Sequence, residues 1–232
     1  TLDLDYLVYF RQASRRQSIE LRVTGGSHIC FLCPLELTDT QITDFFRAKA
    51  DWIHSKLLLN EKRAETPVPK FKHGSCWLYR GRTVSLELSL SSNSVVLDSD
   101  RLGVQTKKMS THDLRKLLKA WLVREAETLL TNRTQHFASC LGIEPSQIQL
   151  RQYRAMWGQC NSCREIAYDW RIIMAPDPVI DYLVIHELCH LAHFDHSSDF
   201  WRLVGPLQPT YTESKAWLRS NAHWIKQTLE RY

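Results

Sequence analysis

Residues 186–196 read HELCHLAHFDH and hold four histidines and one glutamate. His186 and His190 are one helical turn apart, so both imidazoles can bind the same metal ion from one face of a helix. Glu187 follows His186 directly and can accept a proton from a water molecule that the metal activates. This stretch therefore predicts a metal site that performs chemistry.

The residues before this stretch predict a buried helix that begins at Asp177 and ends near His193, which we call the metal helix. Asp177 is suited to cap the helix, and Pro178 fits its first turn. Apolar side chains then cover most of the circumference: Val179, Ile180, Leu183, Val184, Leu188 and Leu191. Burying ionisable groups on such a helix is unfavourable unless they are satisfied. Two histidines that only hydrogen-bond in the core are the alternative, which the glutamate in register with them disfavours.

Two histidines need a third ligand, and His196 is the favoured residue if the chain turns back after His193. His193 itself lies about 10 Å from His186 along the helix axis, too far to share one ion. Glu213, on a later segment, is the rival ligand. The spacing of His186, His190 and His196 matches the long zincin motif, except that His193 stands where that motif has glycine. Three histidine ligands leave a position open for water, so the spacing predicts a catalytic Zn2+ site.

The segment after His196 predicts a short helix that anchors this ligand. Ser197 or Ser198 can cap the helix, and Asp199 lies in its first turn, where the helix dipole favours negative charge. An apolar face follows that can pack behind the metal helix: Phe200, Trp201 and Val204. We expect this packing to fix the turn that holds His196.

The rest of the chain alternates between strand and helix patterns. Gly25-Gly26 lies inside a hairpin pattern, and Thr38 with Gln41 forms a capping box before a helix. Ser110, with Asp113 three residues later, is a second capping signature. The expected elements, in order, are a hairpin over 18–33, a helix over 38–58, a strand over 83–90, a helix over 110–129, and strands over 148–157 and 166–174. This order predicts an α+β fold, with a strand-rich N-terminal part followed by a helical catalytic part.

Length, charge and cysteine content are typical of a cytoplasmic protein. The chain has 232 residues and 24% charged residues, enough for a core that does not depend on disulfides. We find no signal-peptide pattern and no apolar stretch long enough to cross a bilayer, so we expect no membrane partner. The pairs Cys30/Cys33 and Cys160/Cys163 are too far apart for a zinc ribbon, and we interpret them as buried thiols.

Several motifs resemble the YgjP-like family of metal-dependent hydrolases, which is related to the SprT-like zinc proteases. That family pairs a WGSC-like segment with a HELxH helix, a third histidine and a Phe-Trp pair. This chain has WGQC at 157–160, HELCH at 186–190, then His196 and Phe200-Trp201. The N-terminal segments ASRRQSIELRV and KADWIHSKL are similar to the front half of the family, so the resemblance covers nearly the whole chain. Gln159 and the Ala155-Met156 pair depart from the pattern, where serine and basic residues are common.

The resemblance implies a zincin-like fold in a single domain over 1–232, with a strand-rich subdomain over 1–106 and a catalytic subdomain over 107–232. It also implies Glu187 as the general base and zinc held by three residues: His186, His190 and His196. The family is grouped by fold with metallopeptidases, yet members also carry a UTP pyrophosphatase assignment. The resemblance therefore favours a zinc-dependent hydrolase and leaves its substrate open.

The expected substrate is a peptide or a nucleotide, and a nucleic acid is a more weakly supported binding partner. A strand beside the metal helix can hold an extended peptide by edge pairing, which favours a peptidase. Four arginines form either a solvated face or a grip for phosphate: Arg151, Arg154, Arg164 and Arg171. The candidate substrate-binding residues are Trp157, Arg151 and Arg154, although aromatic residues in strands belong more often to the core. A nucleoside triphosphate pyrophosphatase and, given the net charge of +5, a non-catalytic nucleic-acid-binding module are the alternatives to a metallopeptidase.

Overall fold

The computed structural model describes residues 8–13, 17–24, 28–65 and 70–229. The chain divides into two compact units, Thr1–Pro67 and Val68–Tyr232. The subdivision expected at residue 106 stays a prediction. In the described part of the chain, none of the helices combines the length and the apolar character that crossing a membrane requires.

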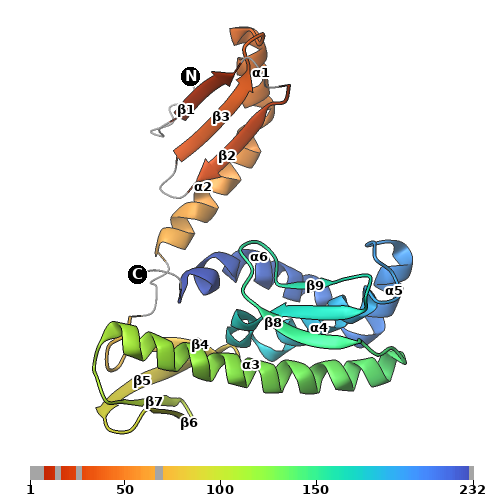
Figure 1. The fold of residues 1–232 in the computed structure, drawn as a ribbon. Helices are drawn as coiled ribbons and strands as arrows, with labels where there is room; N and C mark the ends of the chain where they lie inside the picture. The colour runs from red at the N-terminus through yellow and green to blue at the C-terminus, as the bar shows by residue number, and fades with distance from the viewer. Residues whose placement is uncertain (1–7, 14–16, 25–27, 66–69, 230–232) are drawn as a thin grey trace. The chain divides into compact units, whose positions relative to one another are not determined.

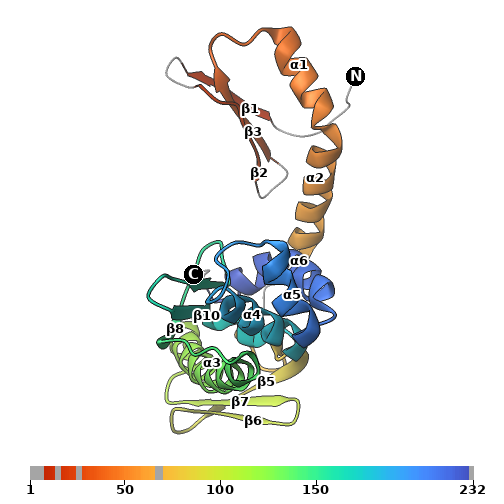
Figure 2. The ribbon, with the colours of Figure 1, turned by 90° about the vertical axis from the view of Figure 1, so that its right-hand side faces the viewer.

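The first unit is a small sheet with two helices along one face (Figures 1 and 2). Its strands are β1 (Val8–Ala13), β2 (Glu20–Thr24) and β3 (His28–Pro34), in the order β1-β3-β2. β2 pairs antiparallel with β3, which confirms the predicted hairpin, and β1 pairs parallel with β3. Phe31 of β3 is fully buried, so this unit has a core of its own.

The helical pattern over 38–58 forms two helices rather than the single one expected. Thr38 and Gln41 make both hydrogen bonds of the predicted capping box at the start of α1 (Asp39–Ala48). Lys49 then leaves helical geometry, with φ −105° and ψ 4°, before α2 (Ala50–Glu65) begins. The apolar spacing continues across this break, which is why periodicity alone did not reveal it.

The second unit begins with a four-stranded sheet in the order β4-β5-β7-β6. The strands are β4 (Cys76–Tyr79), β5 (Arg82–Leu90), β6 (Ser94–Asp98) and β7 (Arg101–Thr106). Val84 and Leu86 of β5 are buried, which confirms the strand predicted over 83–90. Arg80 and Gly81 form the turn before β5, and a Cβ at Gly81 would lie 2.8 Å from Pro176, so this turn contacts the start of the metal helix.

A long helix, α3 (Thr111–Leu141), passes between this sheet and the rest of the unit (Figure 2). Ser110 caps it by accepting a hydrogen bond from the backbone N–H of Asp113, as predicted. The helix continues to Leu141, past the predicted end at 129, and stops where Gly142 adopts a left-handed φ of 65°. Glycine adopts this conformation without steric cost.

A three-stranded sheet, ordered β8-β10-β9, lies beside the metal helix. The strand predicted over 148–157 is only β8 (Gln147–Arg151), and β9 (Gly158–Cys160) is a separate strand. The strand predicted over 166–174 is wrong in its second half: β10 (Glu165–Asp169) is followed by a 3-10 helix, η1 (Trp170–Met174). All five residues of η1 are buried, so the apolar run belongs to the core rather than to one face of a strand.

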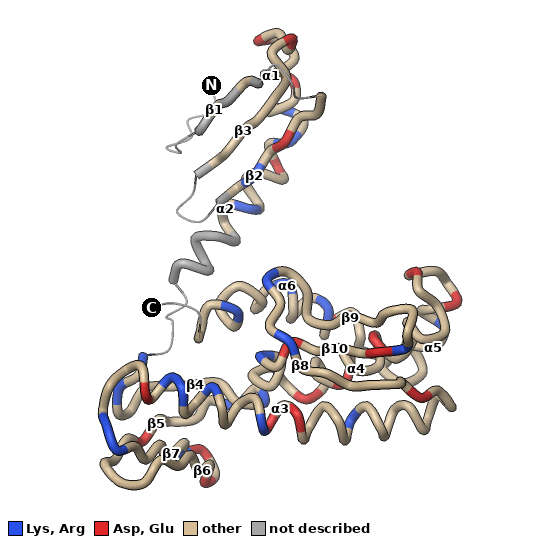
Figure 3. Tube along the Cα trace, viewed as in Figure 1, with Lys and Arg blue, Asp and Glu red and all other residues tan. Residues whose placement is uncertain are grey.

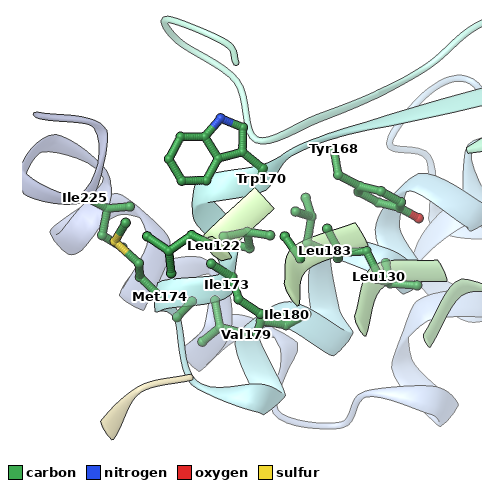
Figure 4. Close-up of a cluster of buried hydrophobic side chains, with 14 of the residues drawn as sticks. Leu122, Leu130, Tyr168, Trp170, Ile173, Met174, Val179, Ile180, Leu183 and Ile225 are labelled. Atoms are coloured by element: carbon green, nitrogen blue, oxygen red, sulfur yellow. The ribbon is translucent and has the colours of Figure 1, made fainter. Parts of the chain in front are cut away.

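The helix α4 (Asp177–Cys189) lies between α3 and the last two helices, α5 (Ser198–Leu207) and α6 (Tyr211–Gln227) (Figure 2). Its N-cap is Pro176, not the predicted Asp177. The Asp177 carboxylate instead accepts two hydrogen bonds from Arg80, at 2.8 and 2.5 Å. Side chains from α3, β10, η1, α4 and α6 meet in one core (Figure 4): Leu122, Leu130, Tyr168, Trp170, Ile173, Met174, Val179, Ile180, Leu183 and Ile225. Apolar packing therefore surrounds α4 and holds its polar residues in fixed positions.

Candidate metal centre

The structure brings three imidazoles to one point. The Nε2 atom of His186 lies 3.2 Å from Nε2 of His190 and 3.2 Å from Nε2 of His196. One ligand nitrogen from each of the three residues lies within 4.8 Å of the other two. A zinc ion bound tetrahedrally at the usual Zn–N distance holds its ligand nitrogens about 3.4 Å apart. The observed spacing therefore fits one ion with little movement.

Polar contacts on the far side of the ring orient two of these imidazoles, those of His190 and His186. Nδ1 of His190 donates to the backbone carbonyl of His193 at 2.9 Å, because a carbonyl oxygen can only accept. Nε2 of His190 is then unprotonated in the neutral ring and presents its lone pair to the cluster. The Tyr182 hydroxyl lies 3.5 Å from Nδ1 of His186, one helical turn earlier. His190 therefore has the tautomer that a metal ligand needs.

The turn between His190 and His196 explains why a histidine can stand where the long zincin motif has glycine. α4 ends at Cys189, earlier than predicted, and His193 N donates to the Cys189 carbonyl at 3.0 Å. Among the described residues, His193 is not one of those with a positive φ. The turn therefore does not require glycine, and His193 contributes its backbone carbonyl to His190.

The segment after His196 forms the predicted helix and contacts His196. Ser197 is the N-cap of α5, although its side chain makes no capping bond. The predicted apolar face is present, with Phe200 and Val204 fully buried. The indole N–H of Trp201 donates to the backbone carbonyl of His196 at 3.1 Å. The position of His196 thus depends directly on Trp201.

Glu187 is a buried carboxylate beside the cluster. Its side chain is 5% exposed, and it has no hydrogen-bond or ion-pair partner in the part of the chain that the structure describes. Burial raises the pKa of Glu187 to about 8. Burying a carboxylate without a partner is costly, and such groups concentrate at functional sites. A cation at the three imidazoles would favour the charged form of Glu187.

Burial also favours the neutral form of two of the imidazoles, His186 and His190. Burial and the neighbouring His190, His196 and Lys215 lower the pKa of His186 to about 3. Burial is also the main reason that the pKa of His190 is lowered. Metal ligands must be deprotonated, so the site favours the form that binds a cation. The donor set, three imidazole nitrogens with a position left for water, fits catalytic zinc.

The edge strand β9 lies against Glu187. A Cβ on Gly158 would lie 2.5 Å from Oε1 of Glu187, so only glycine fits this position without a shift. Burial and the charge of Glu187 raise the pKa of the Cys160 thiol to about 11, which places Cys160 near the same carboxylate. The WGQC motif is thus the part of the sheet that contacts the metal helix.

One edge of β9 is open. Asp169 N donates to the Trp157 carbonyl at 2.7 Å and Asn161 N donates to the Glu165 carbonyl at 3.1 Å, so these positions of the β9 segment face β10. Backbone groups alternate between the two sides of a strand. The N–H and C=O groups of Gly158 and Cys160 therefore point away from β10, to the side on which no described strand pairs with β9.

A buried charge cluster holds the loop that leads into β9. Asp169 and Arg171 are fully buried and joined by two hydrogen bonds, of 2.8 and 2.6 Å. Arg171 also donates to the Tyr153 carbonyl at 2.5 Å. Lys226 of α6 donates to the Met156 carbonyl at 2.5 Å and lies 3.6 Å from the Asp169 carboxylate. The loop before β9 is therefore fixed by two cations and one carboxylate.

The structure does not bring the predicted substrate-binding residues into the histidine cluster. Trp157 packs under the ammonium group of Lys226, 4.5 Å from its ring centre. Arg151 is exposed and lines a separate cavity of about 300 Å³ with Tyr153, Gln159 and neighbouring residues. Arg154 is exposed on the loop. Arg171 is neither on a solvated face nor available to phosphate, because it is paired inside the core. A role in substrate binding stays a prediction for Trp157, Arg151 and Arg154.

Other expected ligands lie elsewhere. Glu213 is exposed in the first turn of α6 and is not part of the histidine cluster. The cysteines are free thiols, and Cys33 is buried as expected, whereas Cys163 is exposed. Within the described ranges, the three histidines form the only group of three or more potential ligands close enough to hold one metal.

Sequence reasoning missed three residues of this region. Tyr182 was detectable, because it lies one helical turn before His186. Gly158 was noticed only as part of a motif, since its contact with Glu187 joins distant parts of the chain. Lys226 gave no signal, because its hydrogen bond to the Tyr153 carbonyl spans 73 residues of sequence.

Comparisons with known proteins point to one family. A family model described as the YgjP-like metallopeptidase domain matches residues 17–221. The crystal structure of the metallopeptidase zymogen of Pyrococcus abyssi abylysin is similar over 40% of this chain and 95% of that chain, with 22% identity and a TM-score of 0.38. Among curated proteins, none matches this sequence.

Proposed function

Because the chain belongs to the YgjP-like metallopeptidase domain family, we propose that it is a zinc-dependent peptidase. In this proposal the zinc ligands are His186, His190 and His196, and Glu187 is the general base. A peptide is bound in extended form along the open edge of β9. The proposal goes beyond the family description because it assigns a role to each residue of the site.

One observation carries the proposal: the buried carboxylate of Glu187, which has no partner among the described residues, follows directly after a member of a cluster of three convergent imidazoles. A purely structural site would not need Glu187, and burying its charge would only destabilise the fold. A hydrolytic site needs a base at this position. The position of Glu187 next to the cluster therefore favours a catalytic metal site over a structural one.

Zinc in such a site supplies Lewis acidity and lowers the pKa of water towards about 7. An oxygen of Glu187 accepts the proton of the attacking water and then delivers it to the amide nitrogen that leaves. Gly158 leaves room for the carboxylate to approach this position. The open N–H and C=O groups of Gly158 and Cys160 hold the peptide backbone by strand addition. These backbone groups contact only the backbone of the peptide, so the strand itself imposes little preference for particular substrate side chains.

Nucleotide hydrolysis is the weaker alternative. Magnesium-dependent phosphate chemistry relies on carboxylate ligands, and the potential metal site found among the described residues contains only histidines. One of the four arginines proposed to hold phosphate, Arg171, is neutralised by Asp169 in the core. Neither observation favours a nucleotide over a peptide.

The test compares the wild-type protein with Glu187→Gln and Glu213→Gln variants after zinc content has been measured. We expect all three proteins to bind one zinc ion each. The wild type and Glu213→Gln should cleave a denatured protein substrate and leave UTP intact, whereas Glu187→Gln should be inactive. His186→Ala and His190→Ala should lose zinc. Full activity of Glu187→Gln, or normal zinc content in both histidine variants, would contradict the proposal.

A further inference from the structure

We propose that Lys215, together with Trp201 and Tyr211, forms a subsite beside the metal centre that binds a carboxylate group of the substrate. The inference rests on the proposed peptidase function and specifies the substrate class. It predicts a preference for peptides with an acidic side chain, or a free C-terminus, close to the cleaved bond.

An aromatic wall adjoins the metal ligands on the side of α5 and α6. The rings of Trp201 and Tyr211 are stacked with their centres 4.8 Å apart and an angle of 21°. The ring of Trp201 is also nearly parallel to that of His196, with centres 6.0 Å apart. Trp201 and Tyr211 are both half-buried, so part of this wall is accessible. The wall therefore extends from the metal ligands to the surface.

Lys215 places a positive charge on this wall. It follows Tyr211 by one turn of α6, so both side chains lie on the same helical face. Its ammonium group lies 5.0 Å from the ring centre of Trp201, within the range of a cation–π contact. The ammonium group is thus held by a ring that itself contacts a metal ligand.

No described carboxylate neutralises this charge. Asp199 pairs with Arg202, at 2.9 Å, and no ion pair joins Lys215 to an acidic residue of the described ranges. A bound metal cation would add positive potential nearby. A carboxylate of the substrate would be attracted by the Lys215 ammonium group and by the metal, whereas a cationic side chain of the substrate would be repelled by both. This arrangement of charges favours the binding of an anionic group of the substrate.

The chemistry of the wall selects a carboxylate near the scissile bond. A flat apolar ring supports the aliphatic part of an acidic side chain, and the ammonium group of Lys215 donates hydrogen bonds to its oxygens. Because Trp201 contacts His196, the subsite lies within a few peptide residues of the metal. The open edge of β9 contacts only the backbone of the peptide. Lys215 therefore supplies the selectivity for a substrate side chain that the strand lacks.

The first experiment measures binding without turnover. Zinc-loaded Glu187→Gln protein is titrated with peptides that differ only by Glu, Gln or Lys at each position, each as a free acid and as a C-terminal amide. We expect one position at which Glu binds about 10-fold more tightly than Gln. A difference only between free acid and amide would identify the C-terminus as the carboxylate. Equal affinities for all peptides would overturn the inference.

Charge reversal provides the matched control. Lys215→Glu should remove the preference for Glu and create one for Lys, while Lys215→Arg should retain the original preference. The first half of α3 carries several Lys and Arg residues (Figure 3), and among them Lys116 is exposed. Lys116→Glu makes the same change in net charge and should leave the preference unaltered. The same preference in Lys215→Glu as in wild type would refute the subsite.

Cleavage assays separate this inference from the proposed function. If the wild type cleaves Glu and Gln peptides at equal rates and binds them equally, the subsite is wrong and the peptidase function stands. If zinc-loaded wild type binds Glu peptides selectively through Lys215 but cleaves no peptide, the function is wrong and the carboxylate subsite stands.

Discussion

Gly158 of β9 lies directly against the carboxylate of Glu187 of α4. A Cβ atom at Gly158 would lie 2.5 Å from Oε1 and 2.7 Å from Cδ of Glu187. The Gly158→Ala substitution therefore forces either the strand or the carboxylate to move. Since positional errors of about 1 Å in a catalytic group can reduce rates about 100-fold, we expect a loss of kcat of this order with zinc content unchanged.

Gly205 of α5 provides the control for this substitution, because a Cβ there meets nothing within 4 Å. Gly205→Ala should leave activity unchanged and stabilise the helix slightly. Steady-state kinetics and zinc analysis of both variants check the expectation. Equal activity of Gly158→Ala and wild type would show that Glu187 has room to adjust.

With His196 as a zinc ligand, as we propose, the hydrogen bond from Trp201 to the His196 carbonyl links zinc affinity to an indole N–H. Trp201→Phe keeps a ring but removes the donor, and Trp201→Ala removes both. Groups that orient a ligand commonly change metal affinity by about 10–100-fold. We expect both variants to release zinc more readily to a competing chelator, Trp201→Ala more so. Folded Trp201→Ala protein with wild-type zinc affinity would show that the turn holds His196 unaided.

The buried pair of Arg171 and Asp169 should dominate the stability of the second unit. Arg171→Met leaves the Asp169 carboxylate buried with less compensation, which typically costs about 3–5 kcal/mol in free energy of unfolding. Arg202→Met, which breaks the exposed pair with Asp199, should cost less than about 1 kcal/mol. Chemical denaturation of the two variants measures the difference. Similar losses in both would contradict the role assigned to the buried pair.

Glu187 should make the metal-free protein less stable as the pH rises. Burial raises the pKa of Glu187 from 4.5 to about 8, so the folded state binds more protons than the unfolded state between these values. His186 has the opposite effect, because its pKa falls from 6.5 to about 3, and its influence ends above its unfolded pKa. Between about pH 6.5 and 8, stability should therefore fall by up to about 1.4 kcal/mol per pH unit through Glu187.

The Glu187→Gln variant isolates this effect. Its free energy of unfolding, measured without metal, should exceed that of the wild type by an amount that grows as the pH rises through this window. Denaturation at several pH values in the presence of a chelator gives the difference. A constant difference across the window would mean that Glu187 has an ordinary pKa in the folded protein.

Local patterns in the sequence were sufficient to predict the parts of the fold that depend on neighbouring residues. The caps at Thr38 and Ser110 formed as predicted because their partners lie three residues away. The helical spacing of His186 and His190 predicted their convergence for the same reason. His196 also lies near enough in sequence for a short turn to bring it back.

Long-range partners explain most of what the sequence could not show. Asp177 fits the pattern of a helix cap, but Arg80, 97 residues away, binds its carboxylate. The run from Trp170 to Met174 looks like a strand until the surrounding helices bury all of its residues. From the sequence, Arg171 was expected at the surface, whereas in the structure it is buried in the core and paired with Asp169.

The contact of Lys226 with the loop before β9 has a consequence for the newly synthesised chain. All three histidines are synthesised before Lys226, and at about 5–20 residues per second the 30 residues from His196 to Lys226 take roughly 2–6 s. During that interval the nascent chain has the three histidines that we propose as zinc ligands, but lacks the ammonium group that donates to the Met156 carbonyl. In the proposed peptidase, the residues that bind the ion are therefore made before the residue that fixes the loop leading into the substrate-binding strand.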